Sequence, residues 1–135
     1  MNVYFAFSIR GEKPDKNIIN GVYEFLINRG HKVMTEFNIK VENKNILLNE
    51  GFNEEDIFKR DIDALEKSDI LIADVTNPSL GVGYEIAHAI NKNIKVYAFV
   101  KKGVNLSCMI KGNKEITLIE YENLEDLLNQ LKKYF

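Results

Sequence analysis

Glu85 is an acidic residue at an unusual position in this sequence. It lies about one helical turn after a glycine-containing turn, inside a predicted helix over residues 78–91 that is otherwise mostly apolar. An unpaired carboxylate in a buried helix costs free energy, so its presence there favours a chemical role. The alternative is a partly exposed glutamate on the helix surface.

Asp61 is the second candidate acid. In a predicted helix over residues 53–67 it lies one turn after Ile57, which places both residues on the inward face. Two carboxylates at one site are the arrangement that cleaves glycosidic bonds. The alternative is a surface aspartate paired with Lys59 or Arg60.

Polar groups suited to an anion occur at two strand ends. Ser8 and Arg10 end the first predicted strand, where a hydroxyl and a guanidinium can clamp a phosphate. Ser79 begins the helix that carries Glu85, and Gly81 allows backbone amides at that helix N-terminus to approach an anion. Taken alone, Ser8 could equally form a turn and Arg10 could be a solvated surface residue.

Strands and helices alternate along the chain and must position these groups. Strands are expected over residues 2–8, 31–36, 69–74, 94–100 and 115–119, and helices over 15–29, 53–67, 78–91 and 124–134. A long loop is expected over 37–52, and a short element of uncertain type over 105–112. This alternation predicts a single α/β domain over residues 1–135, with a five-stranded, mostly parallel sheet and helices on both faces in a three-layer, Rossmann-like or flavodoxin-like fold. Ligands of such sheets bind beyond the carboxyl ends of the strands, where the candidate residues lie.

The composition excludes several classes of function. Lys plus Arg number 18 and Asp plus Glu number 20, and the resulting net charge of −2 gives no electrostatic case for binding nucleic acid or membranes. The single cysteine, Cys108, cannot form an internal disulfide and is expected in the core. No spacing suggests a metal site, and no cofactor is expected. The first residues lack a secretory signal, so a cytoplasmic location is expected.

Four stretches of the sequence together resemble a known family. They are FSIRG after the first strand, the acidic helix that ends at Ser68-Asp69, VTNPSLGVGYE, and LSCMIKG. The combination resembles the 2'-deoxynucleoside 5'-phosphate N-hydrolases, a branch of the nucleoside 2-deoxyribosyltransferase superfamily, over nearly the whole chain. Phe37 departs from this pattern, since the relatives carry a histidine there, and residues 37–52 are dissimilar.

The resemblance implies a role for each matching residue. It makes Glu85 the nucleophile and Asp61 the acid that assists the departing base, with Tyr4 orienting the nucleophile. The implied phosphate site comprises Ser8, Arg10, Ser79, the Gly81 backbone and Ser107, the last reaching over from the neighbouring subunit of a homodimer. Ile9 and Phe37 are expected beside the sugar and base.

The implied function is hydrolysis of the N-glycosidic bond of 2'-deoxynucleoside 5'-monophosphates. Three alternatives remain open: a nucleoside 2-deoxyribosyltransferase, an N-hydrolase of ribonucleotides such as CMP, and a non-catalytic nucleotide-binding module. The phosphate-binding set argues against the first. Tyr4 argues against the second, because a phenylalanine is associated with relatives that act on ribonucleotides. Retention of both acids argues against the third.

Overall fold

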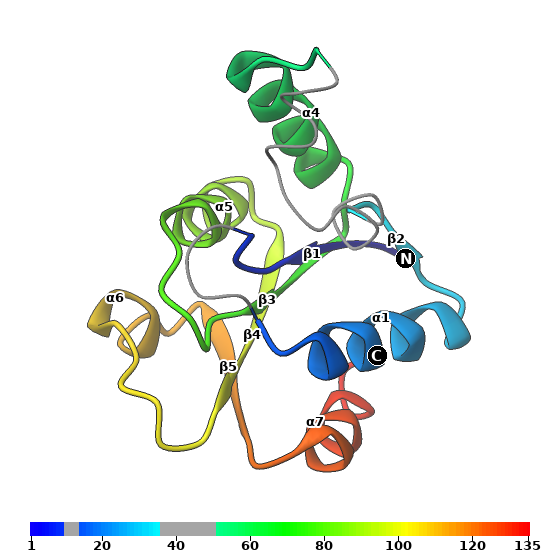
Figure 1. The fold of residues 1–135 in the computed structure, drawn as a ribbon, viewed down its shortest axis with the longest axis vertical. Helices are drawn as coiled ribbons and strands as arrows, with labels where there is room; N and C mark the ends of the chain where they lie inside the picture. The colour runs from blue at the N-terminus through cyan, green and yellow to red at the C-terminus, as the bar shows by residue number, and fades with distance from the viewer. Residues whose placement is uncertain (10–13, 36–50) are drawn as a thin grey trace.

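A parallel sheet forms the centre of the molecule (Figure 1). The computed structural model describes residues 1–9, 14–35 and 51–135, and within them the sheet has five strands in the order β2-β1-β3-β4-β5, all pairings parallel. The strands are β1 (Asn2–Ala6), β2 (Lys32–Val33), β3 (Ile70–Asp74), β4 (Lys95–Lys101) and β5 (Ile116–Tyr121). This is the strand order of flavodoxin-like folds, which confirms the predicted three-layer α/β class.

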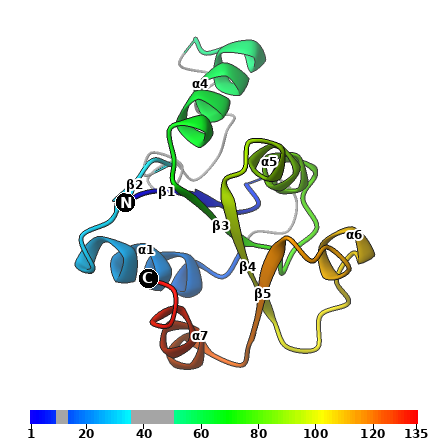
Figure 2. The ribbon, with the colours of Figure 1, turned by 180° about the vertical axis from the view of Figure 1, so that it is seen from behind.

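Helices cover both faces of this sheet (Figures 1 and 2). Helices α1 (Lys16–Asn28) and α7 (Leu124–Leu131) lie on one face. Helices α4 (Glu54–Glu66) and α5 (Leu80–Asn91) lie on the other, and the short α6 (Cys108–Lys111) lies beside α5. In the part of the chain described, no helix is long and apolar enough to cross a membrane.

Successive residues of β1 supply the two apolar cores. Val3 and Phe5 pack toward α1 and α7, whereas Tyr4 and Ala6 pack toward α4 and α5. This alternation follows from the two-residue repeat of a strand. Tyr4 is only 1% exposed, so its phenol is fixed beneath the helices that carry Glu85 and Asp61.

The structure corrects several sequence predictions in detail. The second strand is two residues long and not the six expected, and residues 105–112 contain a four-residue helix. Cys108 is exposed on that helix and is not a core residue, because the short helix buries none of its side chains. The predicted loop over 37–52 lies almost entirely outside the described residues.

Candidate active site

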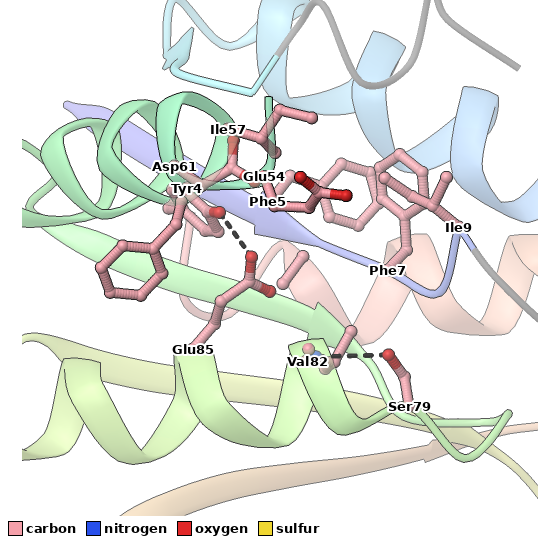
Figure 3. A pocket seen from close by; sticks show the side chains of 13 residues that line it. Tyr4, Phe5, Phe7, Ile9, Glu54, Ile57, Asp61, Ser79, Val82 and Glu85 are labelled. Atoms are coloured by element: carbon pink, nitrogen blue, oxygen red, sulfur yellow. Dashed lines mark hydrogen bonds between the residues drawn. The ribbon is translucent and has the colours of Figure 1, made fainter. Parts of the chain in front are cut away.

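A cavity of about 320 Å³ opens between β1, α4 and α5 (Figure 3). Three of the predicted residues, Tyr4, Asp61 and Glu85, line it together, each from a different element. The rest of the described lining comprises Phe5, Ala6, Phe7, Ile9, Glu54, Ile57, Phe58, Ser79, Gly81 and Val82. The cavity thus combines apolar walls with three carboxyl groups, those of Glu54, Asp61 and Glu85, and a phenol, a composition typical of small-ligand sites.

Tyr4 and Glu85 form the central polar contact of the cavity. The phenol oxygen of Tyr4 donates a hydrogen bond to Glu85 Oε1 at 2.6 Å (Figure 3). The side chain of Glu85 is half-buried. Its exposure is thus intermediate between the two alternatives left open by the sequence, a buried carboxylate and a glutamate on the helix surface. Such a short bond between a hydroxyl and a carboxylate is charge-assisted, and it fixes the direction of the carboxylate.

The environment of Tyr4 keeps its phenol protonated. Burial raises the pKa of Tyr4 well above its ordinary value, and the nearby Glu85 and Asp61 raise it further, while Arg60 opposes the rise. A buried phenolate beside two acids would be strongly disfavoured. Tyr4 therefore acts as a hydrogen-bond donor to Glu85, not as a base.

Asp61 is both buried on the inward face of its helix and paired with Arg60, so it has features of both alternatives that the sequence left open. It is 6% exposed and lies on the packed face of α4 with Ile57 and Leu65. It is also paired with Arg60, whose Nη2 lies 2.9 Å from Asp61 Oδ1. Asp61 is carried by α4, and the start of this helix is fixed by a capping box between Asn53 and Asp56.

The N-terminus of α5 supplies the predicted anion-binding groups. Ser79 caps the helix, with its hydroxyl accepting a hydrogen bond from the Val82 amide at 3.3 Å. Ser79, Gly81 and Ile9 line the cavity at this end. Ser8 is 2% exposed and is not part of the described lining. Arg10 and Phe37 lie outside the described residues.

Ser107 lies away from this cavity, on an exposed turn where it caps α6. It lines a second, more apolar cavity of about 540 Å³ between α5 and α6, which we call the α5–α6 groove. Ser79 lines both the groove and the first cavity. Leu80 and Met109, which are 97% and 82% exposed, flank the groove.

The sequence profile of a known family matches residues 3–126 of the chain, and its description is nucleoside 2-deoxyribosyltransferase. The chain belongs to the nucleoside 2-deoxyribosyltransferase family. This result confirms the resemblance inferred from the four sequence stretches.

Several members of the family are similar to this chain over most of their length. A protein of Methanococcoides burtonii, provisionally named 2'-deoxynucleoside 5'-phosphate N-hydrolase 1, is 37% identical over 84% of this chain and 91% of its own. The Nematostella vectensis protein with the same provisional name is 36% identical over 98% and 92%. The 5-hydroxymethyl-dUMP N-hydrolase of Danio rerio is 32% identical over 100% and 96%.

A solved structure shares the fold of this family member. The CMP N-glycosidase of Clostridium botulinum superposes with a TM-score of 0.77 over the full length of both chains, at 22% identity. The likeness extends to the whole three-layer arrangement.

Some cavity residues of this family member were not identified from its sequence. Phe5, Phe7, Glu54 and Val82 line the cavity but had been given no role from the sequence. Phe58 also lines the cavity, and its place one helical turn before Asp61 on α4 could have predicted this. Its ring meets that of Tyr84 edge-on, with centroids 6.0 Å apart.

The C-terminal ends of the two helices that bear the acids are joined by polar contacts to Glu66. His88, one turn beyond Glu85, contacts Glu66 of α4 at 2.9 Å and not Glu85, and Lys92 contacts the same Glu66 oxygen at 3.0 Å. These contacts lower the pKa of Glu66. They join the C-terminal end of α4 to that of α5.

Proposed function

We propose that this protein hydrolyses the N-glycosidic bond of 2'-deoxynucleoside 5'-monophosphates, releasing the free base and 2-deoxyribose 5-phosphate. The observation that carries the proposal is the joint placement of Tyr4, Glu85 and Asp61 in one cavity beside the N-terminus of α5. The names of the relatives from Methanococcoides, Nematostella and zebrafish support the same reaction.

In the proposed first step, Glu85 attacks the anomeric carbon of the sugar. The bond from that carbon to the base nitrogen breaks, its electron pair goes to the base, and Asp61 supplies a proton to the base. The transition state has oxocarbenium character, as in retaining glycosidases. The hydrogen bond from Tyr4 supports this step because it directs the attacking carboxylate.

In the proposed second step, water attacks the same carbon and displaces Glu85. Asp61, now ionised, takes a proton from that water and is ready for the next cycle. The net reaction consumes one water molecule. No metal or cofactor takes part in this proposal, since each proton and electron pair is accounted for by the two acids and the water.

The 5'-phosphate is proposed to bind at the N-terminus of α5. Ser79 and the Gly81 backbone lie there in the cavity, and the helix dipole favours an anion at this end. Ser8 and Arg10 are proposed to complete the clamp from the end of β1, and Ile9 and Phe37 to border the sugar and base. The proposed location of the protein is the cytoplasm.

The proposed active unit is a homodimer with shared sites. Ser107 lines the α5–α6 groove and does not belong to the described lining of the cavity in its own chain, which supports this proposal. Reciprocal donation of Ser107 across a two-fold axis would place it at the phosphate of the partner.

Chromatography of reaction mixtures tests this function. The protein is incubated with dGMP, dCMP, GMP and deoxyguanosine, and free base is measured. We expect base release from the deoxynucleotides, and a loss of several orders of magnitude for deoxyguanosine, because charged hydrogen bonds to phosphate are worth about 1.5–3 kcal/mol each. Preference for deoxyguanosine, or faster transfer of its sugar to added adenine than to water, would instead establish a transferase.

The Glu85→Gln variant tests the nucleophile directly. It should fold normally and release no base, and mass spectrometry of quenched wild-type reactions should detect a deoxyribosyl phosphate adduct on Glu85. Near-normal turnover by the variant contradicts the assignment.

A further inference from the structure

The guanidinium of Arg60 donates two hydrogen bonds to one carboxylate oxygen of Asp61. Nε lies 3.2 Å and Nη2 2.9 Å from Asp61 Oδ1. The side chain of Asp61 is 8% exposed and that of Arg60 28%, so the pair is largely shielded from water. A shielded, charge-assisted contact of this kind constrains the orientation of a side chain more than a surface ion pair does.

Arg60 makes this contact although other acids have better spacing on the helix. Neighbouring residues on a helix do not face each other, whereas residues three or four apart do. Asp56 and Asp63 have that spacing from Arg60, but Asp56 accepts the Asn53 amide in the capping box, and Asp63 pairs with Lys67 at 2.7 Å. The Arg60 side chain therefore turns toward the buried acid.

Arg60 also lies within electrostatic range of the other reactive groups. Its positive charge lowers the pKa of Tyr4, against the effects of burial, Glu85 and Asp61. Among the described residues that act on Tyr4, Arg60 is the cation. It does not belong to the described lining of the cavity, whereas Asp61 does.

We propose that Arg60 is a positioning residue, which holds Asp61 in the orientation for proton transfer and balances the charge that Asp61 carries after giving its proton to the base. This inference rests on the proposed function. In the first step, Glu85 becomes a neutral ester and the proton leaves Asp61, so the negative charge of the site comes to lie on the largely buried carboxylate of Asp61. The guanidinium stabilises that arrangement, and fixing one oxygen leaves the orientation of the other determined.

Variants at position 60 test the role through the leaving group. Arg60→Ala should lower kcat for dGMP by about 10- to 10²-fold, with a smaller effect on KM, since misplacing a reactive group costs this much. Hydrolysis of an N7-methylated dGMP should be affected far less, because its base leaves without needing a proton. Arg60→Lys keeps the positive charge but loses the planar guanidinium that contacts Asp61 through two nitrogens, so it should recover part of the rate lost in Arg60→Ala.

A double-mutant cycle separates positioning from stability. In an Asp61→Asn background, Arg60→Ala should cause little further loss, because the group that it positions is already altered. Lys59→Ala is the matched control, since it removes the adjacent cation, whose pair with Glu55 is exposed. This control should keep wild-type rates on both substrates, and melting temperatures of all variants are recorded.

Three outcomes would overturn the role of Arg60 while leaving the function intact. The first is an equal loss of kcat by Arg60→Ala on dGMP and on N7-methylated dGMP. The second is a double variant whose loss of rate is the product of the losses of Arg60→Ala and Asp61→Asn. The third is a rate for Arg60→Ala equal to that of Lys59→Ala. If Arg60→Ala does not fold, Arg60→Lys and Arg60→Gln carry the same comparison. Failure of the wild-type protein to release base from any deoxynucleotide contradicts the proposed function itself.

Discussion

At the scale of single residues, the direction of one hydrogen bond determines how the site can work. Tyr4 donates to Glu85 at 2.6 Å, and burial raises its pKa well above the ordinary value, which keeps it a donor at neutral pH. Glu85 is therefore held as an acceptor that points into the cavity. The proposed nucleophile depends on this contact for both its orientation and its charge distribution.

Replacing Tyr4 with phenylalanine should slow base release by roughly 10- to 10²-fold, since a hydrogen bond to a charged group contributes about 1.5–3 kcal/mol. The buried ring volume is retained, so the melting temperature should change little. Tyr97→Phe is the matched control, because Tyr97 is a buried tyrosine on the opposite face of the sheet. Steady-state kinetics of both variants measure the effect, and equal rates would show that the hydroxyl of Tyr4 has no part in the reaction.

Sequence periodicity located the acids but not their partners. The spacing of Ile57, Asp61 and Leu65 places Asp61 on the buried face, as found. Pairing of Asp61 with Lys59 or Arg60 was an open alternative, but the sequence could not decide between the two cations or give the two-nitrogen contact, because adjacent helical residues diverge and the surrounding packing decides where a long side chain turns. The family resemblance implied that Tyr4 orients Glu85, but the two residues are 81 positions apart, so only the folded structure gives the geometry of their contact.

At the scale of elements, the first turn of α5 brings the helix N-terminus to the cavity. Gly81 lines the cavity, whereas Gly83 does not belong to its described lining. A Cβ atom at Gly83 would meet no atom within 4 Å, and at Gly81 the nearest would be Ser79 Oγ at 3.9 Å. Both positions accept an alanine in the described structure, and only one faces the proposed phosphate.

Alanine at either glycine should therefore stabilise the helix, by up to about 1 kcal/mol. Only Gly81→Ala should raise KM for a deoxynucleotide, because its methyl group would occupy space beside the phosphate. Thermal melts and steady-state kinetics of the two variants make the comparison. An equal change of KM in both would place the phosphate elsewhere.

The end of β3 holds an acid that lowers stability. Asp74 is 4% exposed, and burial raises its pKa, opposed by its hydrogen bonds with Thr76. The folded state thus binds the proton more tightly than the unfolded state. The contribution of Asp74 to stability is therefore fully present at pH values below the ordinary pKa of an aspartate, and it is lost as the pH rises through the raised value.

Asp74→Asn should remove this pH-dependent cost while it keeps an acceptor for the Thr76 amide. We expect a higher melting temperature than wild type at neutral pH, and a smaller difference at acidic pH. Glu115→Gln, at an exposed position, should show no such trend. A variant that is destabilised at neutral pH would show that the charged carboxylate is stabilising.

At the scale of the whole molecule, the α5–α6 groove is an apolar surface next to the candidate site. The exposed Leu80 and Met109 flank it, and contiguous apolar surface of this kind marks sites of protein association. The position of Ser107 on the groove could not be derived from sequence spacing, since α6 is only four residues long. The arrangement agrees with the proposed homodimer.

Mixing two impaired variants tests whether sites are shared between subunits. Ser107→Ala should lower activity on a deoxynucleotide by about 10- to 10²-fold through the loss of a phosphate contact, and Glu85→Gln should abolish it. A mixed dimer contains one site with Glu85 from one chain and Ser107 from the other, so activity should recover after co-refolding. No recovery, or an active monomer in sedimentation, contradicts the shared site.

Ser79 lines both the cavity and the α5–α6 groove, and this shared residue couples binding at the two sites. Because Ser79 and Val82 line both the cavity and the α5–α6 groove, an occupant of the groove that shifts this turn must change the affinity for the ligand in the cavity. Linkage is reciprocal, so the ligand changes the affinity for that occupant by the same factor. If assembly through the groove brings Ser107 of the partner subunit to the phosphate, dilution would raise KM and saturating substrate would tighten the assembly.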